Sequence, residues 1–132
     1  MNSERMRNII AHGWIAMLFL LMTMTVVWIL QGAMEGNLQA YAQEEGISGL
    51  WNWAIFFSIA AVMPFFVRIW QGKAFRWIVF GITSLWTIVF IGSWVIEGVA
   101  AATAYLILIN VVHHIVAVWT TVIAYKWARI EE

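Results

Sequence analysis

Four long runs of apolar residues constrain this chain more than any other feature. They cover approximately residues 9–30, 51–70, 77–97 and 103–127. Each run holds about 20 residues, and a helix of that length crosses a hydrocarbon core of about 30 Å. None of the runs alternates as a membrane barrel strand does, so helices are the structure that can satisfy the backbone within lipid. The sequence therefore predicts an all-α integral membrane protein, with residues 1–132 forming one domain of four transmembrane helices.

The charged residues define an orientation. All of the Lys and Arg residues fall on one side of the predicted membrane: Arg5 and Arg7, then Arg68, Lys73 and Arg76, then Lys126 and Arg129. The connection over residues 31–50 contains Glu35, Glu44 and Glu45 but neither Lys nor Arg. The positive-inside rule then places both termini in the cytoplasm and this connection outside. We expect an antiparallel up-down bundle in the inner (cytoplasmic) membrane of a bacterium.

The external connection has secondary structure of its own. Asn37 is a residue that commonly caps a helix, and Gly46 is one that commonly ends it. Between them, Leu38, Tyr41 and Ala42 would share one face. The sequence predicts a short interfacial helix here, lying on the membrane surface or on a partner.

Tryptophan is abundant, with ten residues in the chain. Trp is enriched at the boundary between lipid and water, where its ring satisfies both media. Eight of the ten lie near the predicted helix ends, including Trp14, Trp28 and Trp51, and are predicted to form interfacial belts. Only Trp86 and Trp119 lie well inside the predicted spans.

Several kinds of function are excluded by composition. The chain has no Cys, so it has neither disulfides nor thiolate metal sites, and we predict no separate metal centre. Its charges form no basic surface for nucleic acid. It contains no Asp, and none of its seven Glu residues falls in the middle of a predicted span, whereas a proton-coupled transporter normally needs an ionisable carboxylate at that depth. Catalysis by this chain alone is not expected.

The last span carries the densest set of polar residues. At helical spacing, small and polar side chains form one stripe: Asn110, His114, Ala117, Thr121 and Ala124. An amide or imidazole exposed to lipid costs a few kcal/mol, so the stripe must face protein or water. In one interpretation it packs against another helix, of this chain or of another subunit. In the other, His113 or His114 ligates haem or a metal ion, contacts a quinone, or relays protons.

Two further residues bear on the haem interpretation. The motif Arg7-x4-His12-x-Trp14 resembles the start of the four-helix cytochrome b subunits of membrane dehydrogenases, which implies an early haem-ligating histidine at His12. The resemblance covers only these residues, and the matching histidine near the cytoplasmic end of the last helix is missing. His12 lies closer to the cytoplasm than His114 by about 12 Å, so the second axial ligand would be Met63 or a residue of a neighbouring subunit.

Pro64 interrupts the second span, where it removes a backbone donor and predicts a kink.

Three functions remain open. The first is a non-catalytic accessory subunit of a larger membrane complex, with lipid and other membrane subunits as its partners. The second is an electron-transfer subunit that binds haem b or quinone through His113 and His114. The third is a small homo-oligomeric transporter or channel, whose stripe on the last helix would line a symmetric interface.

Overall fold

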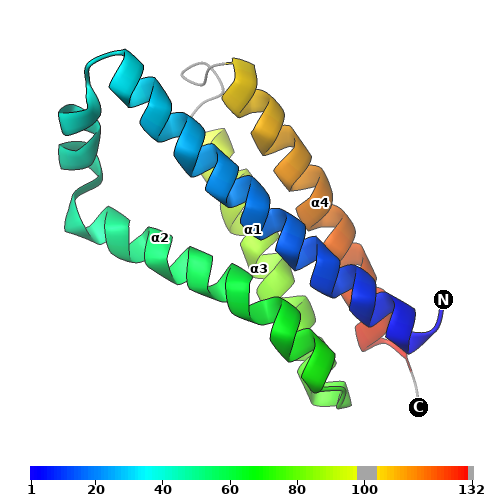
Figure 1. Cartoon of the computed structure of the whole chain (residues 1–132). Helices are drawn as coiled ribbons and strands as arrows, with labels where there is room; N and C mark the ends of the chain where they lie inside the picture. Colours follow the sequence, from blue (N-terminus) through cyan, green and yellow to red (C-terminus); the bar gives the residue numbers. More distant parts are fainter. Residues whose placement is uncertain (98–103, 131–132) are drawn as a thin grey trace.

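The structure, a computed structural model, describes residues 1–97 and 104–130, apart from the side chains of residues 40–42, 44, 45, 47, 48, 96 and 97. It contains four helices: α1 (Ser3–Met34), α2 (Leu38–Ile69), α3 (Lys73–Glu97) and α4 (Ala104–Ala128) (Figure 1). Each contains a segment long and apolar enough to span a membrane, and the described residues include no strand. The all-helical membrane fold is thereby confirmed. The predicted start of the last helix at Thr103 lies outside the described residues.

The helix ends follow local capping chemistry. α1 begins at Ser3, about two turns before the apolar run, because the Asn2 side chain accepts a hydrogen bond from the Arg5 N–H at 2.9 Å. It ends at Met34; Gly36, just past the end, has a φ of 72° that suits glycine, and the Asn37 N–H closes the end on the Gly32 carbonyl at 2.9 Å. The predicted cap at Asn37 is wrong in its chemistry, since its side chain makes no capping hydrogen bond.

The break within α2 occurs at Gly46, where φ is 60° and ψ is −173°. A short helical part precedes this residue, and the segment able to span a membrane runs over Gly49–Ile69. Figure 1 shows the short part turned away from the axis of the spanning part. Pro64 lies within the spanning part, in a continuous helical run. A kink there stays a prediction.

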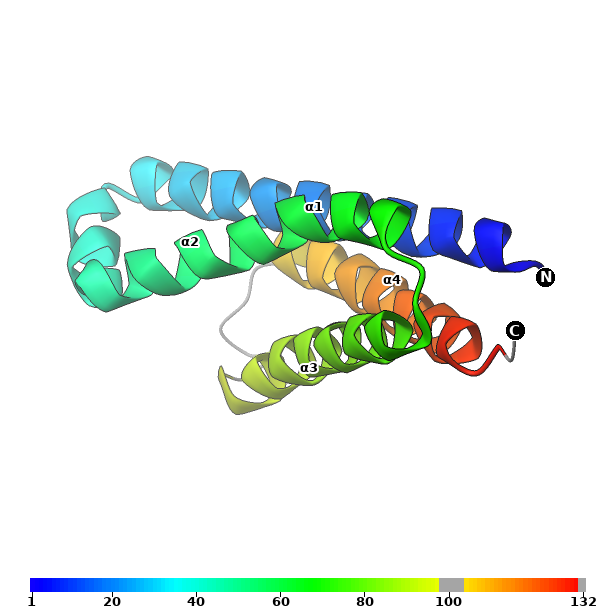
Figure 2. The same cartoon turned by 90° about the horizontal axis from the view of Figure 1, so that it is seen from below.

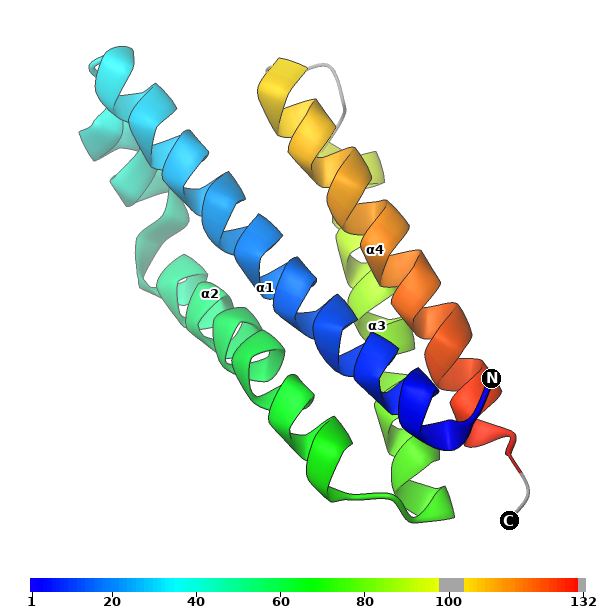
Figure 3. The ribbon, with the colours of Figure 1, turned by 45° about the vertical axis from the view of Figure 1, so that its right-hand side comes forward.

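The helices are packed unevenly. α1 contacts both α4 and α2, and α3 contacts α4, whereas α2 and α3 have little backbone proximity (Figure 2). The two chain ends and the turn between α2 and α3 lie at the same end of the bundle, as seen in Figure 3. The α2–α3 side of the bundle is thus its least closed side.

The closest contact joins α1 and α4 and depends on small residues. Gly13 of α1 lies directly against the Thr120 side chain, so that a Cβ atom at this position would overlap it. Ala117 and Ala124 of α4 are fully buried. Small side chains allow two helices in a membrane to approach closely and gain van der Waals contact. This contact packs α4 against α1, while α3 packs against another side of α4.

Two of the predicted interfacial tryptophans, Trp14 and Trp127, are fully buried core residues instead. Trp14 is completely buried, and its ring meets that of Trp86 edge-on with centroids 5.1 Å apart. Its helical face explains this: Trp14 shares the face of Ile10, Met17 and Leu21, all fully buried at helical spacing. The belt prediction for Trp14 is therefore wrong. The prediction used only the position of Trp14 along the helix, whereas its position around the helix, on the buried face, puts the ring in the core.

Candidate functional site

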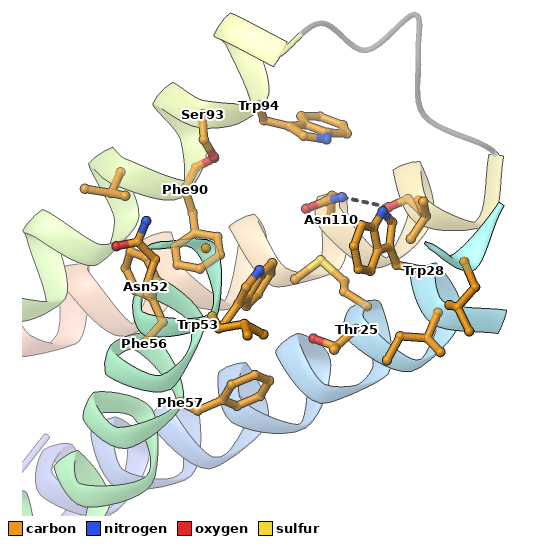
Figure 4. A pocket seen from close by; sticks show the side chains of 17 residues that line it. Thr25, Trp28, Asn52, Trp53, Phe56, Phe57, Phe90, Ser93, Trp94 and Asn110 are labelled. Atoms are coloured by element: carbon orange, nitrogen blue, oxygen red, sulfur yellow. Dashed lines mark hydrogen bonds between the residues drawn. The ribbon is translucent and has the colours of Figure 1, made fainter. Parts of the chain in front are cut away.

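A cavity of about 710 Å³ is lined by residues toward the end of the bundle opposite the termini (Figure 3), and Figure 4 shows its lining from close by. All four helices contribute to it, through the last turns of the spans of α1 and α3 and the first turns of the spans of α2 and α4. Its lining is dominated by aromatic rings: Trp28, Trp53, Phe56, Phe57, Phe90 and Trp94. A concave, mostly apolar cavity of this size with a few polar groups is typical of a small-molecule site.

The cavity exists because α2 and α3 diverge above a single layer of ring contacts. Phe56 of α2 meets Phe90 of α3 with centroids 5.3 Å apart, and it meets Trp86 at 5.4 Å. Trp86 and Phe90 are themselves stacked at 4.8 Å. These rings close the floor of the cavity, and the aromatic side chains beyond them line its walls.

Four polar side chains line the same cavity. The Thr25 hydroxyl donates to the Leu21 carbonyl, and the Ser93 hydroxyl donates to the Phe90 carbonyl, both at 3.0 Å within their own helices. The others are the amides of Asn52 and Asn110.

The Asn110 amide is the best-defined polar group of the cavity. Its Nδ2 donates to the Leu106 carbonyl at 3.0 Å. An amide group has a second N–H and an acceptor oxygen, and neither has a partner in the described part of the chain. Asn110 can therefore both donate to and accept from a bound molecule.

His113 stands beneath this cavity and is fully buried. The Trp86 indole can only donate, so its N–H donates to His113 Nε2, with 3.4 Å between the nitrogens. The hydrogen of the neutral imidazole then lies on Nδ1, which is buried and has no partner among the described residues. The His113 ring also packs 4.7 Å from Phe90, a residue of the cavity lining. The hydrogen bond from Trp86 thus occupies the lone pair of His113 Nε2 and fixes the orientation of the ring.

His114 has the opposite arrangement of donor and acceptor. Its Nδ1 lies 2.6 Å from the backbone carbonyl of Asn110, so Nδ1 carries the hydrogen and donates. Nε2 is left as a lone-pair acceptor, buried and without a partner in the described part of the chain. The ring lies 5.3 Å from Trp94, another lining residue. An imidazole whose Nδ1–H is bound to a carbonyl and whose Nε2 is free is suited to ligate a metal.

The rest of the stripe predicted on α4 is used within the bundle. The Thr121 hydroxyl lies 2.9 Å from that of Thr87 on α3, and Ala117 and Ala124 are buried. Asn110 turns to the cavity and His114 contacts Trp94. The stripe therefore packs inside this chain, and it offers no support for a symmetric interface between copies.

The other candidate ligands lie apart from His114. His12 is exposed on α1, where its Nδ1 is 2.6 Å from the Asn8 carbonyl. Since the neighbouring Gly13 contacts Thr120, His12 lies about 9 Å lower along α4 than His114. Met63 is buried but is not a residue of the cavity lining. These two side chains and His114 do not form a common site.

Sequence reasoning found Asn110, His113 and His114 but not the aromatic lining around them. The only signal was helical spacing: Trp53 precedes Phe56 by three residues, and Phe90 precedes Trp94 by four, so each pair shares a face. Which faces oppose each other depends on how α2 and α3 diverge.

No group of three His, Cys, Asp or Glu residues that could hold a metal ion occurs among the described residues. Comparisons with protein-family models, with curated proteins and with solved structures found no match to this chain.

Proposed function

We propose that this protein is a non-catalytic accessory subunit of a larger membrane complex, with its helices in up-down order and both termini in the cytoplasm of a bacterium. The basic residues support this orientation, because Arg5 is in the first turn of α1, Arg68 in the last turn of α2 and Arg129 just after α4, and these helix ends share one end of the bundle (Figure 3). The outer faces of the helices expose large apolar side chains, which suit lipid and the apolar helices of other subunits.

One residue carries the accessory proposal. Trp119 lies within the span of α4 and is 60% exposed. It is seven residues from Lys126, so its ring lies about 10 Å deeper in the membrane than the cytoplasmic charges, away from the interface that Trp prefers. Its indole N–H has no hydrogen-bond partner in the described part of the chain, and such a group in hydrocarbon costs free energy. A transmembrane helix of another subunit, with an acceptor facing Trp119, would remove this cost.

The first test is the native mass of the protein extracted from its own membranes in a mild detergent. We expect foreign subunits to be released with it, and the Trp119→Leu variant to lose about tenfold of that co-purification, because a buried hydrogen bond and a large aromatic contact are removed. Trp51→Leu is the matched control, since Trp51 is 66% exposed but lies at the start of the span of α2. Equal recovery of partners with both variants, or release of the wild-type chain alone, would contradict the proposal.

A second candidate function is electron transfer through haem b or quinone, and His114 favours it. Among the described residues, His114 would hold haem, because its Nε2 has no partner, whereas His113 Nε2 already accepts from Trp86. Haem, when bound, would supply one-electron chemistry. The Asn110 carbonyl would orient the His114 ring, and any further ligand would come from a partner subunit.

This candidate predicts a haem absorption band in the complex purified from native membranes. We expect His114→Gln to remove the band and His113→Gln to retain most of it, because of the two rings only His114 has an unpartnered nitrogen with a free lone pair. The control is the helical content of both variants by circular dichroism, which should match that of the wild type. Loss of the band in His113→Gln alone would show that the assignment of the two histidines is reversed.

A further inference from the structure

We infer that the cavity between α2 and α3 binds a lipid-soluble ring compound with carbonyl or hydroxyl groups, that is, a molecule of the quinone class. Every residue of the lining comes from the four helices described above, so the cavity is formed by this chain without a partner. The inference therefore stands or fails separately from the accessory proposal. It also requires no haem.

The aromatic lining indicates a flat ring as the occupant. Trp53 projects from α2, Trp28 from α1, and Phe90 and Trp94 from α3, so rings approach the space from several sides (Figure 4). Aromatic rings stack face to face with an offset or meet edge to face, and such pairs are worth about 0.5–1.5 kcal/mol beyond the area they bury. A flat ring gains from this arrangement more than a flexible acyl chain, which presents no ring face.

The polar groups indicate that the ring carries hydrogen-bonding substituents. Asn110 has a spare N–H donor and a spare acceptor oxygen within the cavity lining, and the Asn52 amide lines the same cavity. Polar groups shielded from water lose free energy when they are unpaired. A quinone carbonyl can accept from Asn110 and a quinol hydroxyl can donate to it, whereas an acyl chain leaves the amide unpaired.

The entrance indicates that the compound arrives from the lipid. Leu50 at the start of the span of α2 and Val89 of α3 both line the cavity, and they are 67% and 38% exposed. The backbones of α2 and α3 have little contact with each other. An apolar tail can leave the cavity through this side, so that the ring is bound while the tail stays in the hydrocarbon.

The test uses the full chain, purified and placed in nanodiscs, with decylubiquinone as the probe. Binding is followed by quenching of tryptophan fluorescence, since Trp28, Trp53 and Trp94 line the cavity. We expect saturable quenching, and at least about tenfold weaker binding in Ser93→Phe, because a phenyl ring at Ser93 fills the space. Ser58→Phe is the matched control, because Ser58 is an exposed residue of α2 outside the lining.

A second variant separates a quinone site from a site for lipid tails. Asn110→Leu keeps the branching and the number of heavy atoms of the side chain but removes both hydrogen-bonding groups, and we expect binding to weaken about tenfold, equivalent to about 1.4 kcal/mol. Non-saturable quenching that is equal in wild type and Ser93→Phe would show simple partition into the membrane and overturn the inference. Binding that Asn110→Leu leaves intact and that palmitate displaces would assign the cavity to acyl chains instead.

Discussion

Replacing Gly13 by Ala is expected to lower the thermal stability of the protein by more than a single methyl group normally does. The added Cβ would overlap both Oγ1 and Cγ2 of Thr120. Thr is β-branched and stiff in a helix, and its Oγ1 is held by a hydrogen bond of 2.7 Å to the Val116 carbonyl. Rotation of the Thr120 side chain does not move its Cβ, which would be 3.1 Å from the new methyl group, so α1 and α4 are expected to separate. Overpacking of this kind costs about 1–3 kcal/mol, measured as a lower melting temperature in nanodiscs.

Gly81→Ala is the matched control for this prediction. Gly81 lies within α3 and a Cβ there meets nothing within 4 Å, so the variant should be as stable as the wild type or slightly more stable. A rescue is also expected, because Thr120→Ala removes the Oγ1 and Cγ2 atoms that collide with the new methyl group. The combined variant should regain much of the lost stability. Equal melting temperatures for Gly13→Ala and Gly81→Ala would show that α1 and α4 are not packed at this point.

The four spanning helices were predictable because length and hydropathy alone determine what can cross a bilayer. The sequence could not predict which face of each helix packs against which face of another. Trp14 and Trp119 show the reason: both are tryptophans within long apolar helices, yet Trp14 is fully buried while Trp119 is 60% exposed. In lipid, polarity does not distinguish the inside from the outside of a bundle as it does in water. Packing at small residues such as Gly13 decides instead, and this requires both helices to be known.

The candidate site was predictable in part for a related reason. His113, His114 and Asn110 are costly in lipid, so their side chains could be placed against protein from the sequence alone. Their different roles could not be, because those depend on partners distant in the chain. Trp86, 27 residues before His113, fixes which nitrogen of that ring accepts. The aromatic lining carries no comparable cost in lipid, and for that reason nothing in the sequence marked it.

Arg76 was assigned by sequence only to the cytoplasmic charge, yet the structure buries it to 1% exposure. Its Nε donates to the Gln71 carbonyl at 2.9 Å and its Nη1 to the Ile130 carbonyl at 3.3 Å, so it joins the turn before α3 to the end of α4. The guanidinium also lies 5.7 Å from the centre of the Trp127 ring. Trp127 in turn donates to the Ser3 hydroxyl at 2.9 Å, which extends the connection to the start of α1.

We therefore expect Arg76→Met to lower stability by roughly 2–4 kcal/mol, because it removes two hydrogen bonds from a charged group and a cation–π contact. Lys73→Met is the matched control: it removes the same charge from the same helix end, but Lys73 is exposed. Both variants should insert with unchanged topology, because either leaves two basic residues at the α2–α3 turn. Arg76→Lys should fall between Arg76→Met and the wild type, since an ammonium group retains the charge but cannot reproduce the planar fork of the guanidinium. Melting temperatures of the three variants in nanodiscs check this order. If Lys73→Met lost as much stability as Arg76→Met, the charge itself would account for the effect and the contacts of Arg76 would not.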